Sequence, residues 1–388
     1  MKKKKKRNLL KVLFVLFLFS TLILSFLKSD AKNFDKSLKS KSNTIYATAS
    51  NNKNNKYEKE YKLSKKENKD ITLLIGGSIT SIDDMDNIFI NSKETYNDLF
   101  YYMKDTIDDS VLFLNLNTIL NQKKSHEQFS EALKSLKVDI INTGSKNLLC
   151  HSSKGFFETF NVLKNNNLNV LGLKDNLAEK DYKILNKNEN KIGIISYNLI
   201  NNQSKNSMYN HICSLNTENM EETFFKVEGH MENLKNEGVD FIITIINKNE
   251  ASNEELDKII SNLKERGSNL ILVYDEEKTI INLLKEDNIP IINNASNFLS
   301  FNNIQDSKNY EMNYLIKLVL EKDKNTYKIH NVTYIPLSMY KTNNKLHLIP
   351  LKDKKDYKDL NITNLKDIKI LDKRREETLE YLKKIENN

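Results

Sequence analysis

The sequence has no tryptophan and only 2 cysteines, 3 prolines and 9 glycines among its 388 residues. Collagen-like and mucin-like chains need far more glycine or proline, and a disulfide scaffold needs far more cysteine, so these classes are excluded. Cys150 and Cys213 show no metal-binding spacing. Sequence alone leaves their pairing open, and two free buried thiols are the favoured interpretation.

Several common catalytic motifs are also absent. The chain contains no G-x-S-x-G, no Walker A, no H-E-x-x-H and no G-x-G-x-x-G. Its 6 histidines are scattered, and no two lie three or four residues apart. The usual sequence signs of a serine hydrolase, a P-loop enzyme, a zinc protease and a dinucleotide-binding enzyme are therefore missing.

The net charge of +8 is unevenly distributed along the chain. Residues 1–70 hold 19 Lys and Arg against 6 Asp and Glu, whereas the remaining 318 residues hold 41 against 46. Binding to a phosphate backbone needs a basic surface on the folded part. Because the body of this chain is mildly acidic, we expect no nucleic-acid partner.

The N-terminus carries the signature of a membrane anchor. Five lysines and Arg7 precede an apolar segment over residues 9–27, which is long enough for a helix to cross a bilayer. The preceding positive cluster predicts a single pass with the N-terminus cytoplasmic and the bulk extracellular. The alternative is a signal peptide cleaved near Ala31, which would release a secreted protein.

From Asp70 onward, short apolar runs alternate with amphipathic stretches, which is typical of an α/β fold. The predicted strands cover 71–77, 111–116, 138–142, 170–172, 241–246, 270–273 and 290–292. The predicted helices cover 96–107, 127–136, 155–164, 220–236, 253–266, 279–286 and 371–385. Hairpins are expected over 182–197 and 310–336. We divide the chain into an anchor (1–30), a polar stalk (31–69), a main domain (70–350) and a charged C-terminal segment (351–388).

Polar residues follow many of these strands, where open α/β sheets form their sites. The candidate site residues are Ser78, Asn117, Ser145, Asn147, Asn247, Asp275, Glu277, Asn294 and Asn297. Asn carries both a donor and an acceptor, so these positions are suited to hydrogen bonding. The Asp275-Glu276-Glu277 run could hold Ca²⁺ together with Asn oxygens, although three adjacent carboxylates are usually a solvated turn. No other metal or cofactor is expected.

The order and spacing of these positions resemble the bacterial CapA family of capsule or poly-γ-glutamate biosynthesis proteins. Gly77-Ser78-Ile79 stands where that family has Gly-Asp-Ile, and Asn115-Leu116-Asn117 where it has Asn-Leu-Glu. Asn147 and Asn247 stand at family histidines, and Ser296-Asn297-Phe298 matches Gly-Asn-Phe. The resemblance implies a calcineurin-like metallophosphatase fold, an αββα sandwich of two sheets flanked by helices, behind an N-terminal membrane helix.

The resemblance extends to the scaffold but not to the residues that hold metal ions in that family. A two-metal phosphoesterase site needs carboxylates and imidazoles, and Ser or Asn occupies those positions here. We therefore expect a catalytically inactive accessory protein of capsule, poly-γ-glutamate or other surface-polymer biosynthesis. Its expected partners are the polymer or capsule-biosynthesis membrane proteins. Two alternatives stay open: an active hydrolase with an Asp275 or Glu277 base, and a structural or adhesion module.

Overall fold

The computed structural model describes residues 70–80, 96–145, 148, 153–201, 210–249, 251–275, 282–286, 289–293, 297–299, 313–323, 326–342, 345–351, 357, 360 and 362–386. The chain divides into two compact units, Met1–Lys66 and Glu67–Asn388. All described residues belong to the second unit. Three of the candidate site residues, Asn147, Glu277 and Asn294, lie outside them, as do Cys150, the expected anchor and the stalk.

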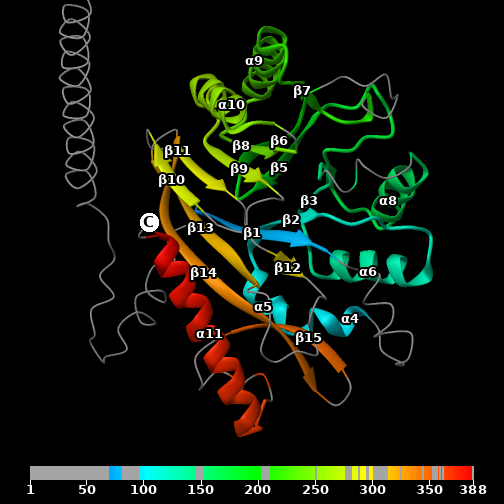
Figure 1. Cartoon of the computed structure of the whole chain (residues 1–388), viewed down its shortest axis with the longest axis vertical. Helices are drawn as coiled ribbons and strands as arrows, with labels where there is room; N and C mark the ends of the chain where they lie inside the picture. Colours follow the sequence, from blue (N-terminus) through cyan, green and yellow to red (C-terminus); the bar gives the residue numbers. More distant parts are fainter. Residues whose placement is uncertain are drawn as a thin grey trace, which may run out of the picture. The chain divides into compact units, whose positions relative to one another are not determined.

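Two mixed β-sheets form the centre of the second unit (Figure 1). The first has the order β15-β14-β13-β12-β1-β2-β3-β4, and the second has the order β10-β11-β9-β8-β6-β5 with β7 paired to β6. The strands of the first sheet are β1 (Ile71–Ile79), β2 (Ser110–Leu116), β3 (Ile140–Asn142), β4 (Val170–Leu171), β12 (Asn297–Leu299), β13 (Asn313–Asp323), β14 (Thr326–Thr342) and β15 (Lys345–Pro350). The strands of the second are β5 (Tyr182–Lys187), β6 (Asn190–Ile200), β7 (Ser214–Asn216), β8 (Phe241–Asn247), β9 (Leu270–Tyr274), β10 (Asn282–Glu286) and β11 (Ile289–Asn293).

Each sheet has a parallel centre and antiparallel additions. In the first sheet, β1 to β4 are parallel neighbours, and β13, β14 and β15 continue as an antiparallel meander. In the second, β6, β8, β9 and β11 are parallel, while β5 and β10 are antiparallel edges. Parallel strands need crossovers, and the intervening helices supply most of them.

The hydrophobic core lies in three layers, which explains why the central strands are apolar on both faces. Along β1, Leu73 packs between the two sheets and Leu74 packs against the outer helices of the first sheet. Along β8, Ile243 faces the other sheet and Ile242 faces the helices of the second. Fully burying each such side chain contributes roughly 1.5–3 kcal/mol.

Helices cover the outer faces of both sheets. Tyr96 of α4 (Tyr96–Leu99), Phe129 of α6 (Lys124–Ser135) and Phe156 of α8 (Ser153–Asn165) belong to the outer core of the first sheet. Met231 of α9 (Met220–Asn236) and Ile259 of α10 (Asn253–Arg266) belong to that of the second. The expected four layers, helix, sheet, sheet and helix, are therefore present.

Local signals explain several element boundaries. A capping box between Ser252 and Glu255 starts α10, and Gly267 ends it in the left-handed conformation. Asn188 and Glu189 both have positive φ and close the β5–β6 hairpin, as a type I′ turn requires. The second predicted hairpin is also present, as β13 and β14.

Two predictions of secondary structure were wrong. The segment 279–286 was expected to be helical, but its described part is β10, which pairs antiparallel with β11. The sheet edge supplies that segment with hydrogen-bond partners that sequence periodicity does not reveal. The segment 96–107 was expected to be one helix and is broken into α4, a 3-10 turn (Tyr101–Met103) and α5 (Lys104–Ile107).

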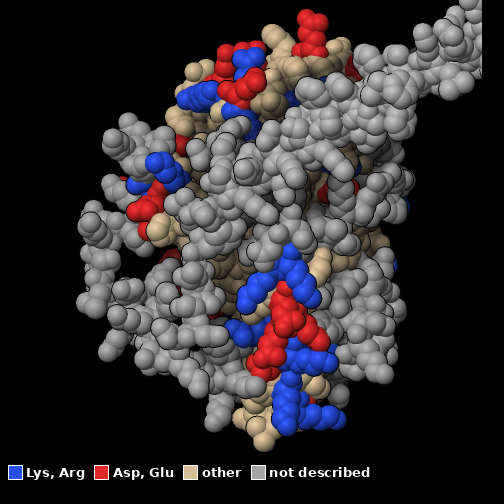
Figure 2. Space-filling model, turned by 60° about the vertical axis from the view of Figure 1, so that its left-hand side comes forward, with Lys and Arg blue, Asp and Glu red and all other residues tan. Residues whose placement is uncertain are grey.

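The C-terminal helix α11 (Leu365–Glu386) packs on β14. Tyr340 of β14 donates to the Asp367 carboxylate over 3.0 Å, and Ile368 and Leu371 join a small apolar cluster with Leu351. On the face drawn in Figure 2, the described Lys and Arg side chains are interspersed with Asp and Glu. Among the residues described there, no large patch of one sign is formed.

Candidate functional site

A row of polar residues runs along one edge of the first sheet, set there by strand register. Ser78 pairs across the ladder with Asn115 on one side and with Asn297 on the other. Asn115 in turn pairs with Asn142, and Asn297 with Asn313. These five residues occupy matching levels of neighbouring strands, so their side chains line the edge at which β1, β2 and β3 end.

The second sheet adds a shorter row at the carboxyl ends of its parallel strands. Asn198 of β6 pairs with Asn247 of β8, and Asn247 pairs with Tyr274 of β9. Tyr274 donates its hydroxyl to the Gly76 carbonyl of β1 over 3.2 Å. The two rows therefore lie at the same edge of the sandwich, and together we call them the amide belt.

Hydrogen bonds between side chains join the two sheets through Asn142. Its Nδ2 donates to Asn115 Oδ1 over 2.7 Å and to Asn247 Oδ1 over 2.9 Å. Its Oδ1 accepts from Ser196 Oγ over 2.6 Å. Asn115 Nδ2 then donates to Ser78 Oγ over 3.0 Å. Asn142 is buried and satisfied, and it forms the centre of the amide belt.

Other members of the amide belt are unsatisfied. The belt also includes Asn117, which follows β2, and Asn293, which ends β11 beside β9. Both side-chain atoms of Asn198 are buried without a hydrogen-bond partner, as are the Oδ1 atoms of Asn117, Asn293 and Asn313. A buried unpaired polar group costs about 1–3 kcal/mol and requires an explanation, such as a water or a ligand. The belt therefore retains hydrogen-bonding capacity that the protein itself does not use.

A close approach of the chain shapes the belt beside Asn198. Gly144 follows β3, and a methyl group at its Cβ position would collide with the side chains of Asn198 and Asn247. Ser145 next to it donates to the Leu116 carbonyl over 3.3 Å. The loop after β3 thus lies directly against the second sheet, and glycine is needed there because no side chain fits.

One ion pair lies at the same edge. Lys248 follows β8 and donates to Asp275 Oδ2 over 3.1 Å, with both side chains less than a tenth exposed. Asp275 comes directly after Tyr274, the last residue of β9. Its charge is balanced by the Lys248 ammonium.

A pair of metal ions does not fit the described residues of the amide belt. Its donors are hydroxyl and amide groups, and the Asn142 Nδ2 that occupies its centre carries hydrogens and cannot ligate a cation. Transition-metal pairs are held by carboxylates and imidazoles. No described residue of the belt is a histidine, and Asp275 is already paired with a lysine.

The structure thus brings together six of the predicted site residues, Ser78, Asn117, Ser145, Asn247, Asp275 and Asn297, at one edge. Sequence reasoning missed seven residues of this edge: Asn115, Asn142, Ser196, Asn198, Lys248, Asn293 and Asn313. A signal existed for Asn142 and Asn198: asparagine is depleted in strands, so an asparagine inside an apolar run indicates a buried polar contact. The partners themselves depend on which strands pair.

The fold and this edge define an α/β sandwich of two sheets with a polar site at the carboxyl ends of its strands. Residues 72–274 match the model of the family described as "Bacterial capsule synthesis protein PGA_cap". The chain belongs to this family, which confirms the resemblance drawn from the sequence. No curated protein matches the chain.

Several solved structures are similar in fold at low sequence identity. A hypothetical protein from Thermus thermophilus aligns at 9% identity and a TM-score of 0.42, over 69% of this chain and 99% of that one. A phosphatase from Mycoplasma pneumoniae aligns at 14% and 0.41, over 69% and 93%. The calcineurin-like phosphoesterase YfkN from Bacillus subtilis aligns at 15% and 0.43, over 81% and 99%.

Proposed function

We propose that this protein is a non-catalytic member of the capsule synthesis family that binds an amide-containing surface polymer along its amide belt. The observation that carries the proposal is a pair of half-buried asparagines, Asn117 and Asn293, whose Oδ1 atoms have no hydrogen-bond partner in the protein. Poly-γ-glutamate is the proposed polymer, because each of its repeat units offers one amide N–H and one C=O.

Amide groups match such a ligand closely. An asparagine side chain donates and accepts at once, as does a peptide-like amide, so the half-buried asparagines of the belt have complementary groups on the polymer. Pairing a buried unsatisfied group recovers about 1–3 kcal/mol. Asn117, Asn293 and Asn297 are half-buried, so they form the accessible side of the belt.

The absence of catalysis is part of the proposal. Hydrolysis of an amide or phosphoester needs an activated water and a base. The described belt offers neutral amides, and the Asp275 carboxylate is engaged by Lys248. An arrangement of this kind binds a chain without cleaving it.

We further propose that the protein is held at the cell membrane, with its body outside the cell. The support is the sequence of residues 1–27, in which a lysine cluster precedes an apolar segment. Within the described part of the chain, no helix is long and apolar enough to cross a membrane, and the expected anchor lies outside that part. Capsule-biosynthesis membrane proteins are the further partners proposed.

The test is binding of the full-length chain, in detergent, to immobilised poly-γ-glutamate. Hyaluronan is the control polymer, because it is also a polyanion but its amide groups are spaced differently. The Asn117→Ala/Asn293→Ala double variant should bind at least tenfold more weakly. Asn262→Ala is the matched control, because Asn262 also has an unpaired Oδ1 but lies on α10. Its binding should equal that of the wild type.

Salt separates the belt from the cationic stalk. Attraction between lysines and a polyanion weakens as ionic strength rises, whereas hydrogen bonding in the belt is screened much less. We expect poly-γ-glutamate to remain bound at high salt and hyaluronan to dissociate. Equal binding of both polymers, equal binding by the double variant, or cleavage of the polymer would contradict the proposal.

A further inference from the structure

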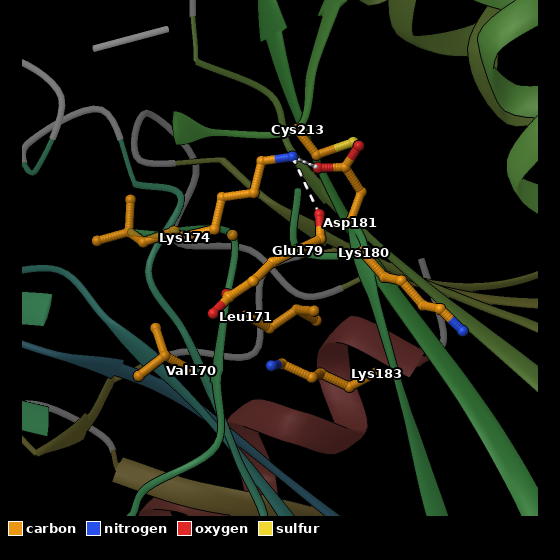
Figure 3. A pocket seen from close by; sticks show the side chains of 10 residues that line it. Val170, Leu171, Lys174, Glu179, Lys180, Asp181, Lys183 and Cys213 are labelled. Atoms are coloured by element: carbon orange, nitrogen blue, oxygen red, sulfur yellow. Dashed lines mark hydrogen bonds and ion pairs between the residues drawn. The ribbon is translucent and has the colours of Figure 1, made fainter. Parts of the chain in front are cut away.

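Three metal-ligating side chains from separate elements meet beside the second sheet. Asp181 precedes β5, Cys213 precedes β7 and His230 lies on α9. One ligand atom from each lies within 4.8 Å of the other two. Figure 3 shows the Cys213 sulfur next to the Asp181 carboxylate. Asp181 and Cys213 are 32 positions apart in the sequence, and Cys213 and His230 are 17 apart. The three residues therefore form no short sequence motif.

We propose that Asp181, Cys213 and His230 bind one Zn²⁺ ion, with a water as the fourth ligand. Carboxylate oxygen, thiolate sulfur and imidazole nitrogen are the three protein ligand types that zinc takes. A carboxylate and a thiolate together carry two negative charges. The Lys174 ammonium, 2.8 Å from Asp181 Oδ1, offsets one of them, so the ligand set keeps one net negative charge toward a cation. The site is separate from the amide belt, and its existence does not depend on what the belt binds.

The distance between two of the ligand atoms is compatible with a zinc site. His230 Nε2 and Asp181 Oδ2 are 3.4 Å apart. An N–H···O hydrogen bond has its donor and acceptor about 2.7–3.2 Å apart. Two ligands at about 2.0–2.1 Å from a tetrahedral zinc are separated by roughly 3.3 Å. The observed spacing therefore matches one edge of such a tetrahedron.

Neighbouring residues hold the ligands in the orientation that a metal requires. The Tyr197 hydroxyl lies 3.2 Å from His230 Nδ1, which leaves Nε2 turned toward Asp181. Lys174 Nζ donates to Asp181 Oδ1 over 2.8 Å, which leaves Oδ2 for the ion. Metal-binding histidines almost always have a partner at their other ring nitrogen, and ligating carboxylates are hydrogen-bonded as well.

A small cavity lies beside the cluster. It is lined by Gly172, Lys174, Asp181 and Cys213 among others, and its volume is about 10 Å³ (Figure 3). That is roughly the space of one water molecule. The cavity has room for a water ligand. Cys213 is itself only 3% exposed, so the ion would be shielded from solvent on the thiolate side.

The test uses the full-length chain, purified in detergent and stripped with a chelator. Titration with Zn²⁺ should give one tightly bound ion per chain by elemental analysis. Co²⁺ in its place should give the thiolate-to-cobalt charge-transfer absorption. Cys213→Ser should abolish that absorption, and Cys213→Ser and His230→Gln should each weaken binding at least tenfold. His330→Gln is the matched control, because His330 also faces a carboxylate, at 3.3 Å, but on the exposed surface.

Folding of each variant is checked by circular dichroism in chelator. Should Cys213→Ser fail to fold, Cys150→Ser decides, because Cys213 is then the one remaining cysteine of the chain. A cobalt–thiolate absorption in Cys150→Ser supports the site. The inference is overturned by wild-type protein without stoichiometric zinc, by Cys150→Ser without that absorption, or by Cys213→Ser that retains it.

Discussion

The amide belt yields a prediction in which one substitution has different effects at two positions. Asn142 and Asn198 are both fully buried asparagines at strand ends. Asn142 makes three side-chain hydrogen bonds, whereas neither side-chain atom of Asn198 has a partner. Asn→Leu changes size and polarity identically at both positions, so the difference between the two variants isolates the hydrogen bonds.

The size of the difference follows from the bonds counted. Asn142→Leu loses three hydrogen bonds, each worth about 1 kcal/mol net, and leaves Asn115 and Asn247 oxygens without that donor. We expect a loss of about 3–5 kcal/mol in the free energy of unfolding. Asn198→Leu removes an unpaired buried amide, which stabilises the folded state by about 1–3 kcal/mol. The bulkier leucine near Gly144 destabilises it by about the same amount. We expect little net change there.

Urea unfolding of the full-length chain in detergent, followed by far-UV circular dichroism, measures both values. The slope of free energy against urea should be the same for both variants, so that the midpoint alone reports stability. The two free energies of unfolding should differ by about 3 kcal/mol or more. A difference under about 1 kcal/mol would refute the claim that Asn142 is the satisfied centre of the belt and Asn198 is not.

Four further predictions test the fold around the belt. Gly144→Ala should lower the unfolding midpoint, because its methyl collides with Asn198 and Asn247, and an unchanged midpoint would contradict the close approach. Gly267→Ala should cost about 1 kcal/mol in urea unfolding, because φ is +101° there. Ile243→Ala, buried between the sheets, should cost about 2–5 kcal/mol by the same assay, and a cost under about 1 kcal/mol would contradict its place in the core. Burial raises the pKa of Tyr274 above its usual 10.0. The stabilisation from the protonated hydroxyl is therefore complete below pH 10.0 and is lost as pH rises through the raised pKa. Tyr274→Phe should flatten the alkaline fall in the thermal midpoint of unfolding, and a fall identical to that of the wild type would contradict the assignment.

Much of the fold was predictable because its strands are buried on both faces. β1 and β8 are continuous apolar runs, and only a strand covered by core on each side needs that pattern. The β5–β6 hairpin was predictable from its polar turn. β10 was not, because a five-residue edge strand owes its conformation to pairing with β11, and pairing is a tertiary property.

The sequence was sufficient to predict which edge of the sheets carries the candidate site. It was not sufficient to predict which side chains form hydrogen bonds there. Residues that follow strands were found by position, as with Asn117 and Asp275. The contact between Asn142 and Asn247 spans 105 residues and depends on the order of strands in two sheets. Lys248 was overlooked because its role comes from a single partner, Asp275, on the neighbouring strand.

Hydrogen bonds between neutral amides join the two sheets at this edge. Carboxylates crowded at the ends of adjacent strands repel one another and need a cation between them. Asparagines both donate and accept, so Asn115, Asn142 and Asn247 close a network across two sheets with no charge to neutralise. Such a network joins the two sheets without bringing like charges together. The cost appears at Asn198 and Asn117, whose buried side-chain atoms have no hydrogen-bond partner in the protein.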